Sequence, residues 1–475
     1  MLEKPLYLNN LKLPNRVVIQ PMEGCDCEYD DGRPSELTLK KYINNAKSGA
    51  ALIWFEANAV TPEGRTNHRQ MMITEKNVDA FKDMLKQVRE TSMKEFGYAP
   101  ICIIQLTHSG RQSIVPMIAY RHPLYEKTRP VTDENIVTDE YLDTLPDLYL
   151  NAAKLALEAG FDGVDVKSCH GYLFQEVLSG FTRPGRYGGS FENRIKYALE
   201  LVKAMKEAAP DMVIEYKLPI RTLNPDGTLR GKGGLDEAEA IEFAKLLEQA
   251  GVDMIQVAQA NHTGNMGDTI PPMGMQPYNW TLPTAKKIKA VVNVPIITVG
   301  RVITVEAGEK ILQDGDADLI GYGRSLLADP DIALKAESGE PIRTCLNCNK
   351  GCLDAIQGRT YISCVLNAEN GNEETVFIKP STTSKKVAVV GAGIAGLEAA
   401  RVAAKRGHKV TVFDNLSSGL RCNLFADNDF IYGNILIPSD IEAAFAQGFD
   451  AFVHLAAFKA AGESMVTPEK YSINN

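Results

Sequence analysis

The sequence lacks any apolar run close to the roughly 20 residues needed to cross a bilayer. Its start, MLEKPLYLNN, lacks the apolar core of a signal peptide. Basic residues are not in excess either, because 51 Lys and Arg stand against 60 Asp and Glu, a formal net charge of −9. Binding to nucleic-acid phosphates needs concentrated basic side chains, so this balance favours a small-molecule partner. We therefore expect a cytoplasmic protein with no membrane and no nucleic-acid partner.

Low-complexity tracts and repeats of solenoid period are also missing. With 44% hydrophobic and 23% charged residues, the chain can bury a large core. Its 475 residues exceed one ordinary domain, because domains average about 150 residues and barrels reach about 250. The nine cysteines of a cytoplasmic chain suit metal or redox chemistry better than a disulfide framework.

Short apolar, β-branched runs alternate with amphipathic stretches of helical period between positions 17 and 322. This α/β pattern favours a closed parallel (β/α)8 TIM barrel over an open doubly wound sheet, which would usually be smaller. Barrels place their chemistry at the carboxyl ends of the strands, so polar residues just after each run are the candidates. The expected strands are VVIQPM from Val17, ALIWFEA from Ala51, ICIIQL from Ile101, FDGVDVK from Phe161, MVIEYKL from Met212, VDMIQVA from Val252, VPIITVG from Val294 and ADLIGYG from Ala317.

The sequence divides into four expected segments. Residues 1–340 form the barrel, and residues 341–375 form a cysteine-rich segment. Residues 376–384 contain Pro, Ser, Thr and Lys, which indicates an exposed linker. Residues 385–475 open with a strand, a glycine turn, a helix and a second strand, the start of a Rossmann-like dinucleotide-binding fold. About 90 residues are too few to complete that fold, so we expect an incomplete domain.

Two Gly-Arg pairs follow the last two expected strands of the barrel. Gly300-Arg301 and Gly323-Arg324 stand where barrels commonly hold a phosphate with backbone N–H groups and an adjacent cation. The alternative is a pair of ordinary turns with surface arginines. The occurrence of both pairs favours the phosphate site.

Six ordered segments carry a family resemblance: NRVVIQPM, IIQLTHSGR, VDVKSCHGYLFQEVLSG, RYGGSFENR, ITVGR and IGYGRSLLADP. They resemble the Old Yellow Enzyme family of NADH:flavin oxidoreductases. More narrowly, they are similar to its multidomain branch, which includes 2,4-dienoyl-CoA reductase and bile-acid enone reductases. The resemblance implies an FMN-binding barrel that reduces activated C=C bonds, with the FMN phosphate on the two Gly-Arg pairs.

Other residues at strand ends match flavin-contacting positions of that family. Gln105 ends the third expected strand and Lys217 ends the fifth, and the resemblance places both at the flavin pyrimidine edge. A cation there stabilises the anionic reduced flavin. Met22 and Ala57 match positions beside the isoalloxazine ring. Glu23 stands where some members attach FMN through a cysteine, so we expect noncovalent FMN.

The block KSCHGY follows the fourth expected strand. When hydride adds to the β-carbon of an enone, negative charge grows on the carbonyl oxygen, and preorganised donors must meet it. The resemblance gives His170 the carbonyl-binding role and Tyr172 the protonation of the α-carbon. Lys167 occupies the first position of the family's usual His-x-x-His/Asn pair. This departure leaves the second donor and the unsaturated carbonyl substrate open.

A cysteine cluster follows the barrel. Cys345, Cys348, Cys352 and Cys364 have the spacing C-x2-C-x3-C-x11-C, which suits the four corners of a [4Fe–4S] cubane. Zinc is the competing ligand, although zinc ribbons usually pair two C-x2-C knuckles. In the family, a cluster at this place relays electrons between FMN and a second flavin.

The C-terminal segment combines two patterns. Gly391, Gly393 and Gly396 form G-x-G-x-x-G after a strand, and Asp414 closes the second strand at the ribose-binding distance. They resemble the FAD-binding opening of the same reductases. From about Val410 onward the sequence is instead similar to the N-terminal part of a UDP-sugar 4-epimerase. We therefore expect a chimeric segment that binds FAD or NAD weakly at most.

The function expected from these patterns is an FMN-dependent ene-reductase with a [4Fe–4S] relay, fed by NAD(P)H or an electron-transfer protein. One alternative is an amine dehydrogenase of the same superfamily that exports electrons through the cluster. The other is a remnant that binds flavin and cluster without turnover.

Overall fold

The computed structural model describes residues 1–122, 126, 129–220, 235–259, 266–425 and 429–475. These residues separate into two compact units, Met1–Thr375 and Val376–Asn475. Within the described ranges, no helix is long and apolar enough to span a bilayer.

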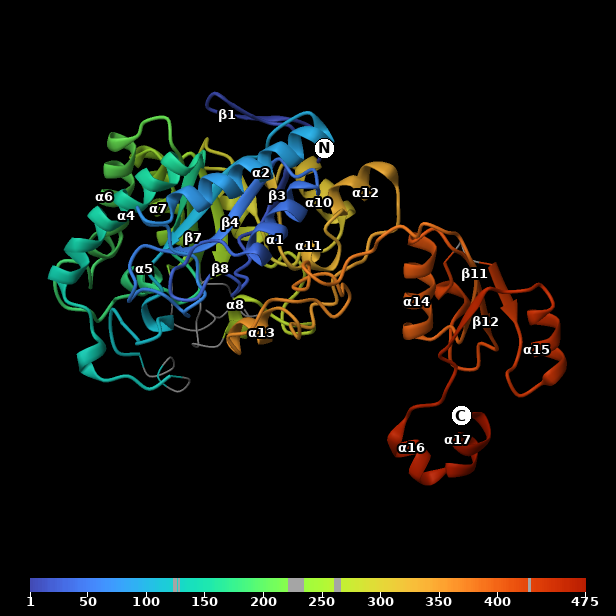
Figure 1. Ribbon diagram of the computed structural model, residues 1–475. Coiled ribbons are helices and arrows are strands. Elements are labelled where there is room, and N and C mark those ends of the chain that lie inside the picture. Colours follow the sequence, from blue (N-terminus) through green and yellow to red (C-terminus); the bar gives the residue numbers. More distant parts are fainter. Residues whose placement is uncertain (123–125, 127–128, 221–234, 260–265, 426–428) are drawn as a thin grey trace. The chain divides into compact units, whose positions relative to one another are not determined.

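The first unit contains the closed parallel barrel that the sequence predicts, with strand order β10-β3-β4-β5-β6-β7-β8-β9 (Figure 1). Each expected run supplies one strand, and pairing of β10 with β3 closes the ring. The strands are β3 Val17–Ile19, β4 Leu52–Ala59, β5 Ile101–Thr107, β6 Gly163–Lys167, β7 Val213–Ile220, β8 Met254–Gln259, β9 Ile296–Thr298 and β10 Leu319–Tyr322.

Amphipathic helices surround the barrel, and local signals set their ends (Figure 1). Thr138 begins one long helix by accepting a hydrogen bond from the Tyr141 amide, and Gly160 ends it at φ 100°. The helices of this unit are α1 Glu36–Ala46, α2 Val78–Phe96, α4 Asp139–Ala159, α5 Leu173–Leu178, α6 Phe191–Ala208, α7 Glu237–Ala250, α8 Met266–Thr269, α9 Leu282–Lys289, α10 Val305–Gln313, α11 Arg324–Ala328, α12 Ile332–Ser338 and α13 Leu353–Gln357, with 3-10 turns at Gly110–Gln112 and Asp133–Asn135.

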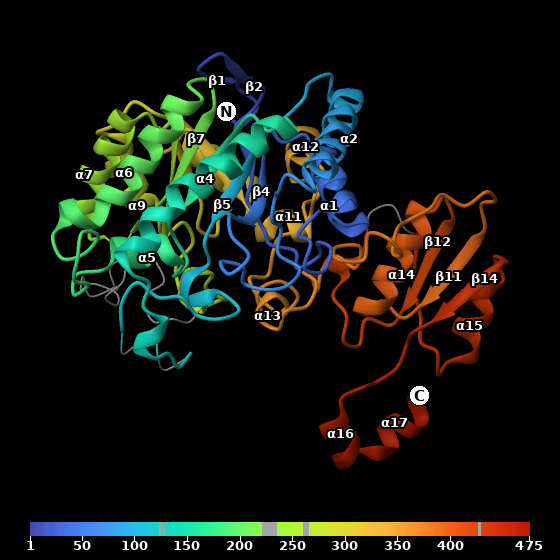
Figure 2. The same cartoon turned by 60° about the vertical axis from the view of Figure 1, so that its left-hand side comes forward.

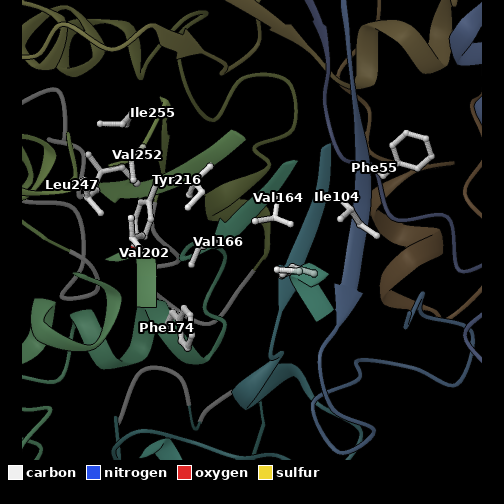
Figure 3. Packing of buried hydrophobic residues seen from close by; sticks show 14 of the residues in the cluster. Phe55, Ile104, Val164, Val166, Phe174, Val202, Tyr216, Leu247, Val252 and Ile255 are labelled. Carbon is white, nitrogen blue, oxygen red and sulfur yellow. The ribbon is translucent and has the colours of Figure 1, made fainter. Parts of the chain in front are cut away.

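The apolar core of this unit has two layers. The outer layer fills the space between strands and helices, and Figure 3 shows part of it around Phe55, Ile104, Val164 and Tyr216. Alternate strand residues face opposite sides of a sheet, so the neighbours of these outward residues point into the barrel.

The inner layer fills the lower half of the barrel. It includes Trp54 and Ile103 together with Leu8 and Leu13 of a hairpin that the sequence patterns did not indicate. This hairpin pairs β1, Leu6–Leu8, with β2, Leu11–Leu13, and closes the base where the strands begin.

Above the apolar layer the inward positions become polar. Asp165 and Lys167 are two residues apart on β6, and Glu215 and Lys217 occupy the paired positions on β7. Because every second residue of a strand faces the same side, all four side chains point toward the barrel interior. Each of them is at most 5% exposed. A polar layer therefore separates the core from the barrel mouth.

The second unit holds a four-stranded parallel sheet of order β13-β12-β11-β14 (Figure 2). The chain adds β12 and β13 on one side of β11 and then β14 on its other side. The same change of side occurs at the switch point of a dinucleotide-binding sheet. Its elements are β11 Lys386–Val390, α14 Ile394–Lys405, β12 Lys409–Asp414, a 3-10 turn at Arg421–Asn423, β13 Asp429–Tyr432, α15 Pro438–Phe445, β14 Ala451–His454, α16 Ala461–Val466 and α17 Pro468–Asn474.

Candidate active site

A cavity opens at the carboxyl ends of the barrel strands, where the sequence patterns place the site. It also contains residues that the patterns did not single out, notably Gln20, Trp280 and Asn347. The predicted site residues that line it are Met22, Lys167, His170, Tyr172, Lys217, Gly300, Arg301, Gly323, Arg324 and Cys352.

The two Gly-Arg turns form one end of this cavity. Gly300 has φ 129°, and a side chain there would meet the Thr281 hydroxyl at 2.9 Å. Arg301 adopts a left-handed φ of 63°, and its guanidinium lies 4.4 Å from the Tyr278 ring centroid. Its buried Nε has no hydrogen-bond partner among the described residues. Because buried polar groups are nearly always paired, this donor fits an anionic ligand such as the FMN phosphate.

Arg324 is shared between the cavity and the cysteine segment. Its Nη1 donates to the Pro271 carbonyl at 3.1 Å and to the Asn349 side-chain oxygen at 2.5 Å. Burial lowers the pKa of the guanidinium, and the nearby Cys345 and Cys352 oppose this shift. The arginine thus joins the proposed phosphate turn to the cysteine loop.

The flavin-edge candidates separate in the structure. Lys217 lines the cavity, with Nζ 4.8 Å from the Trp54 ring centroid. Gln105 lies deeper, and its Nε2 donates to Asp165. Ala57 is buried in β4, and its carbonyl accepts from the Gln70 amide at 3.3 Å. Gln105 and Ala57 are outside the described lining of this cavity, so their flavin contacts stay predictions.

A buried carboxyl pair lies beneath the cavity, and the sequence patterns did not single it out. Burial raises the pKa of both Asp165 and Glu215, and the charge of Asp165 raises the pKa of Glu215 further. Glu215 accepts from the Gln256 amide at 2.9 Å, while Asp165 accepts from Gln105. Because two adjacent buried carboxylates repel each other, the fold favours the protonated form of Glu215. The signal was present in the sequence as Asp-x-Lys and Glu-x-Lys on neighbouring strands.

The catalytic candidates lie together where β6 leads into α5. His170 is half-buried and adopts a left-handed conformation, φ 63°, which is uncommon outside glycine and is often found at functional sites. Burial, followed by the charges of Lys217 and Lys167, lowers the pKa of His170 well below its ordinary value. The imidazole is therefore neutral at pH 7, with one N–H donor and one acceptor.

Lys167 and Tyr172 are in direct contact. The ammonium nitrogen lies 3.7 Å from the Tyr172 ring centroid. Burial lowers the pKa of Lys167 to about 8, and burial raises the pKa of Tyr172 well above its ordinary value. Glu23 adds to the shift of Tyr172, and its carboxylate accepts from the Thr66 hydroxyl at 2.8 Å. Tyr172 is thus a protonated phenol beside the cavity.

The four clustered cysteines line a second cavity together with Arg324. Cys345 Sγ accepts a hydrogen bond from the Asn347 amide at 3.3 Å, and Asn347 and Asn349 both have positive φ. Burial raises the pKa of Cys345 and Cys352.

Four thiols around one cavity are a donor set of the kind that binds a [4Fe–4S] cubane. Among the described residues, no three His, Cys, Asp or Glu side chains are gathered closely enough to hold one metal ion. Tetrahedral zinc would require sulfurs about 4 Å apart, given Zn–S bonds of about 2.3 Å. A cubane places its ligands at the corners of a cage, so the thiols can stand farther apart around one cavity.

Comparison with known proteins places the chain in a family. The model of the NADH:flavin oxidoreductase / NADH oxidase family matches residues 1–342. The chain belongs to this family. A second model, that of the NAD dependent epimerase/dehydratase family, matches residues 387–475.

One relative of this chain is bilirubin reductase of Mediterraneibacter gnavus, which is 42% identical over 425 residues. The match covers 86% of this chain and 63% of the relative, so the chain spans less than two thirds of that protein's length. The solved structure of 2-naphthoyl-CoA reductase with 2-naphthoyl-CoA has a TM-score of 0.83 at 23% identity, over 97% of this chain and 74% of that chain. Histamine dehydrogenase from Rhizobium sp. 4-9 has a TM-score of 0.78 at 22% identity, over 96% and 69%. Both structural likenesses show the fold.

The C-terminal unit contains the predicted glycine turn. Gly391 has φ 106°, and a side chain on Gly396 would meet the Gly391 carbonyl oxygen at 1.7 Å. Asp414 accepts from the Ala392 amide and from the Leu416 amide, each at 2.6 Å. The carboxylate therefore braces the turn itself. Gly393 faces open space, because a side chain on it would meet no described atom within 4 Å.

Proposed function

We propose that this chain is an FMN-dependent reductase of activated C=C bonds. The observation that supports this most directly is the placement of Lys167, His170 and Tyr172 in the cavity whose opposite end is formed by the two Gly-Arg turns. In this proposal, a proton donor and two carbonyl-binding groups would stand beside the flavin ring.

The residues present fit FMN. Arg301 and Arg324, with the backbone of Gly300 and Gly323, would hold the phosphate, and Lys217 would face the pyrimidine edge. Met22 would lie beside the ring, and Gln105 would be positioned beneath it by Asp165. When bound, reduced FMN supplies a hydride.

The chain's own residues prepare the substrate for that hydride. Neutral His170 donates a hydrogen bond to the carbonyl oxygen, where negative charge grows as the β-carbon is reduced. Tyr172 keeps its proton because burial raises its pKa, and it gives that proton to the α-carbon. Tyr172 then regains a proton from water.

We propose a [4Fe–4S] cluster on Cys345, Cys348, Cys352 and Cys364, since these thiols line one cavity. Cys352 also lines the flavin cavity, which brings the two centres near each other. The cluster would pass electrons singly between FMN and a donor, either NAD(P)H acting through another flavin or an electron-transfer protein. The C-terminal glycine turn would bind FAD or NAD weakly.

An amine dehydrogenase is the second candidate, because the fold is similar to that of histamine dehydrogenase. The charge of the cavity disfavours it. An ammonium substrate would meet Lys167 and Lys217, which already lower the pKa of His170 by repulsion. A remnant without turnover is the remaining alternative.

The decisive experiment reduces the flavin with dithionite under anaerobic conditions, removes the excess and mixes the protein with 2-cyclohexenone or histamine. An ene-reductase is reoxidised by the enone and not by the amine. An amine dehydrogenase instead has its oxidised flavin reduced by histamine. If neither reaction occurs while the absorption spectrum shows flavin and cluster, the chain is a remnant.

A further inference from the structure

A second cleft in the first unit is lined by basic side chains. It has a volume of about 390 Å³ and shares no lining residue with the cavity of the candidate active site. Arg69, Arg129 and Arg359 all line it, and no Asp or Glu is among the described residues of its lining. The chain as a whole is acidic, with a formal net charge of −9, so this concentration of arginine departs from the average of the sequence.

Two of these arginines have few partners within the described part of the chain. Arg359 is exposed and makes no hydrogen bond or ion pair there. Arg69 donates one hydrogen bond, to the Cys27 carbonyl at 3.2 Å. Its guanidinium lies 5.7 Å from the ring centroids of Tyr29 and Tyr361. Both guanidinium groups therefore keep most of their N–H donors available for a ligand.

The third arginine, Arg129, is held in place by the backbone. Its guanidinium donates to the Arg111 carbonyl at 2.8 Å and to the Ser113 carbonyl at 2.5 Å. These acceptors are neutral, so they fix the side chain and leave its charge uncompensated. Burial lowers the pKa of Arg129, and the charges of Arg359 and Arg111 lower it further. Arg129 and Arg359 thus lie close enough to repel each other.

One carboxylate near the cleft belongs to a different pair. Asp30 lies 2.5 Å from Nδ1 of His68, a residue of the lining, and its side chain is 63% exposed. The ring of His68 is also stacked on Tyr29, with centroids 4.9 Å apart. Asp30 is therefore engaged at the edge of the cleft by a group other than the arginines.

A wall of three polar side chains lies between the cleft and the cavity of the candidate active site. Thr66 and Asn67 line the cleft, and they donate hydrogen bonds of 2.8 and 2.9 Å to the carboxylate of Glu23. Glu23 lines the other cavity. Its negative charge would repel an anionic chain that passed from one space to the other, so the two spaces suit different molecules.

The charge and size of the cleft indicate the chemistry of its ligand. Three positive charges that repel one another favour an anion with more than one negative charge. Guanidinium forks match the oxygens of phosphate groups and bind them through paired hydrogen bonds. A monocarboxylate would compensate only one of the three charges. The volume also falls within the range of about 300–1,000 Å³ that is typical of small-molecule sites.

We propose that this cleft binds the phosphate or diphosphate group of a small molecule that is distinct from the substrate, and that Arg69, Arg129 and Arg359 hold it. The site is independent of the proposed reductase function, because none of its residues lines the cavity where that chemistry is placed. Binding involves no covalent change in the protein or the ligand.

The test measures binding of inorganic pyrophosphate to the FMN-loaded protein by titration calorimetry. Loaded protein is used so that FMN occupies the two Gly-Arg turns and pyrophosphate does not bind there. We expect one pyrophosphate per chain, and an affinity that falls as sodium chloride is added, because salt screens a partly exposed charge cluster. Acetate, with a single charge, should bind at least about 10-fold more weakly.

Two variants assign the binding to the cleft. Arg359→Gln and Arg69→Gln should each weaken pyrophosphate binding by on the order of 10-fold, as expected for the loss of a hydrogen bond between charged groups. Flavin absorbance per protein should be unchanged, which verifies the fold. Arg33→Gln is the matched control, since Arg33 is a half-exposed arginine of the same unit that pairs with Asp31 at 3.4 Å.

Three results would overturn the inference. The first is a dissociation constant for pyrophosphate weaker than about 1 mM in the unmodified protein. The second is equal affinity in the parent, Arg359→Gln and Arg69→Gln. The third is competition, in which pyrophosphate raises the concentration of 2-cyclohexenone that gives half-maximal reoxidation of the reduced flavin, because the cleft would then belong to the substrate site. An unchanged enone concentration supports a separate ligand.

Discussion

The two units of this chain use parallel sheets in different ways. In the barrel, every residue of β4, β5, β7 and β8 is buried. In the C-terminal unit, every residue of β14 is exposed, and Phe452 retains 66% of its accessible surface. A closed sheet has no edge and encloses its inward side chains, whereas an open sheet must be covered by other elements.

This difference bears on where the chemistry resides. The barrel carries a polar layer, a walled cavity and charged groups with shifted pKa values, all held by strands that pair on both sides. The C-terminal unit offers a glycine turn braced by Asp414. We therefore expect flavin chemistry to depend on the first unit, and four predictions test that contrast in order of decreasing effect.

The largest effect should come from the phosphate turns. Arg301→Ala combined with Arg324→Ala removes both cations, and we expect the protein to lose nearly all of its FMN. Flavin absorbance per protein after desalting measures this, and circular dichroism verifies the fold. Arg406→Ala, an exposed arginine of the second unit, is the control and should keep its flavin. Stoichiometric FMN in the double variant would show that these turns do not hold the phosphate.

The second prediction concerns the histidine donor. His170→Ala should slow reoxidation of the reduced flavin by 2-cyclohexenone by on the order of 10²-fold, with unchanged flavin content. His454→Ala, on the exposed β14, should react at the parent rate. A rate for His170→Ala within about threefold of the parent would make His170 structural.

The third prediction uses the buried carboxyl pair. The pKa of Glu215 is raised in the fold, so the native state keeps a proton that the unfolded chain releases near pH 4.5. Stability from this group therefore falls as the pH rises from about 4.5 toward the raised native pKa. Glu215→Gln cannot titrate. The difference between its melting temperature and that of the parent should therefore increase between pH 5 and pH 8.

The gain should be a few degrees at most, since each kcal/mol shifts the melting temperature by about 2–4 °C in domains of about 150–250 residues and by less in a larger unit. Glu95→Gln, an exposed glutamate of helix α2, is the control and should follow the parent at every pH. A constant difference between Glu215→Gln and the parent would mean that Glu215 does not hold a proton in the fold.

The smallest effect should come from removing the second unit. A chain that ends at Lys379 should keep its FMN, its iron and its rate of enone reduction from chemically reduced flavin nearly unchanged. Neither form should show NADH-driven turnover through a second flavin. Tight FAD in the full chain, lost on truncation, would show that the C-terminal unit is a working cofactor domain.

The barrel could be predicted because each strand combines a buried apolar run with a polar end. The same rule led to the cavity residues, since strand ends such as Lys167 and Lys217 meet at one rim. The hairpin β1–β2 escaped prediction because its strands, Leu6–Leu8 and Leu11–Leu13, alternate leucine with a single Tyr or Lys and lack the continuous apolar run that marks β3 and β9. Gln105 also lies near the end of its strand, yet Asp165 on β6 accepts its hydrogen bond and holds it below the described lining of the cavity. A single sequence does not reveal such a contact.

The cysteine segment teaches a related point. Spacing alone predicted that four thiols would gather, and they line one cavity. Spacing could not predict that Arg324 contacts Asn349 of the same loop, because the two residues lie on segments without a common pattern. Contacts between distant segments are set by packing in three dimensions, and they account for most of what the sequence patterns missed.

The hairpin at the base of the barrel has an evolutionary consequence. Leu8 and Leu13 close the end opposite the cavity, so the lower half of the barrel is an apolar core that does not contact substrate. Selection on the lower half acts through stability, and selection on the rim acts through chemistry. Because a polar layer separates the two halves, substitutions at the rim would alter binding while leaving the apolar packing of the lower half in place.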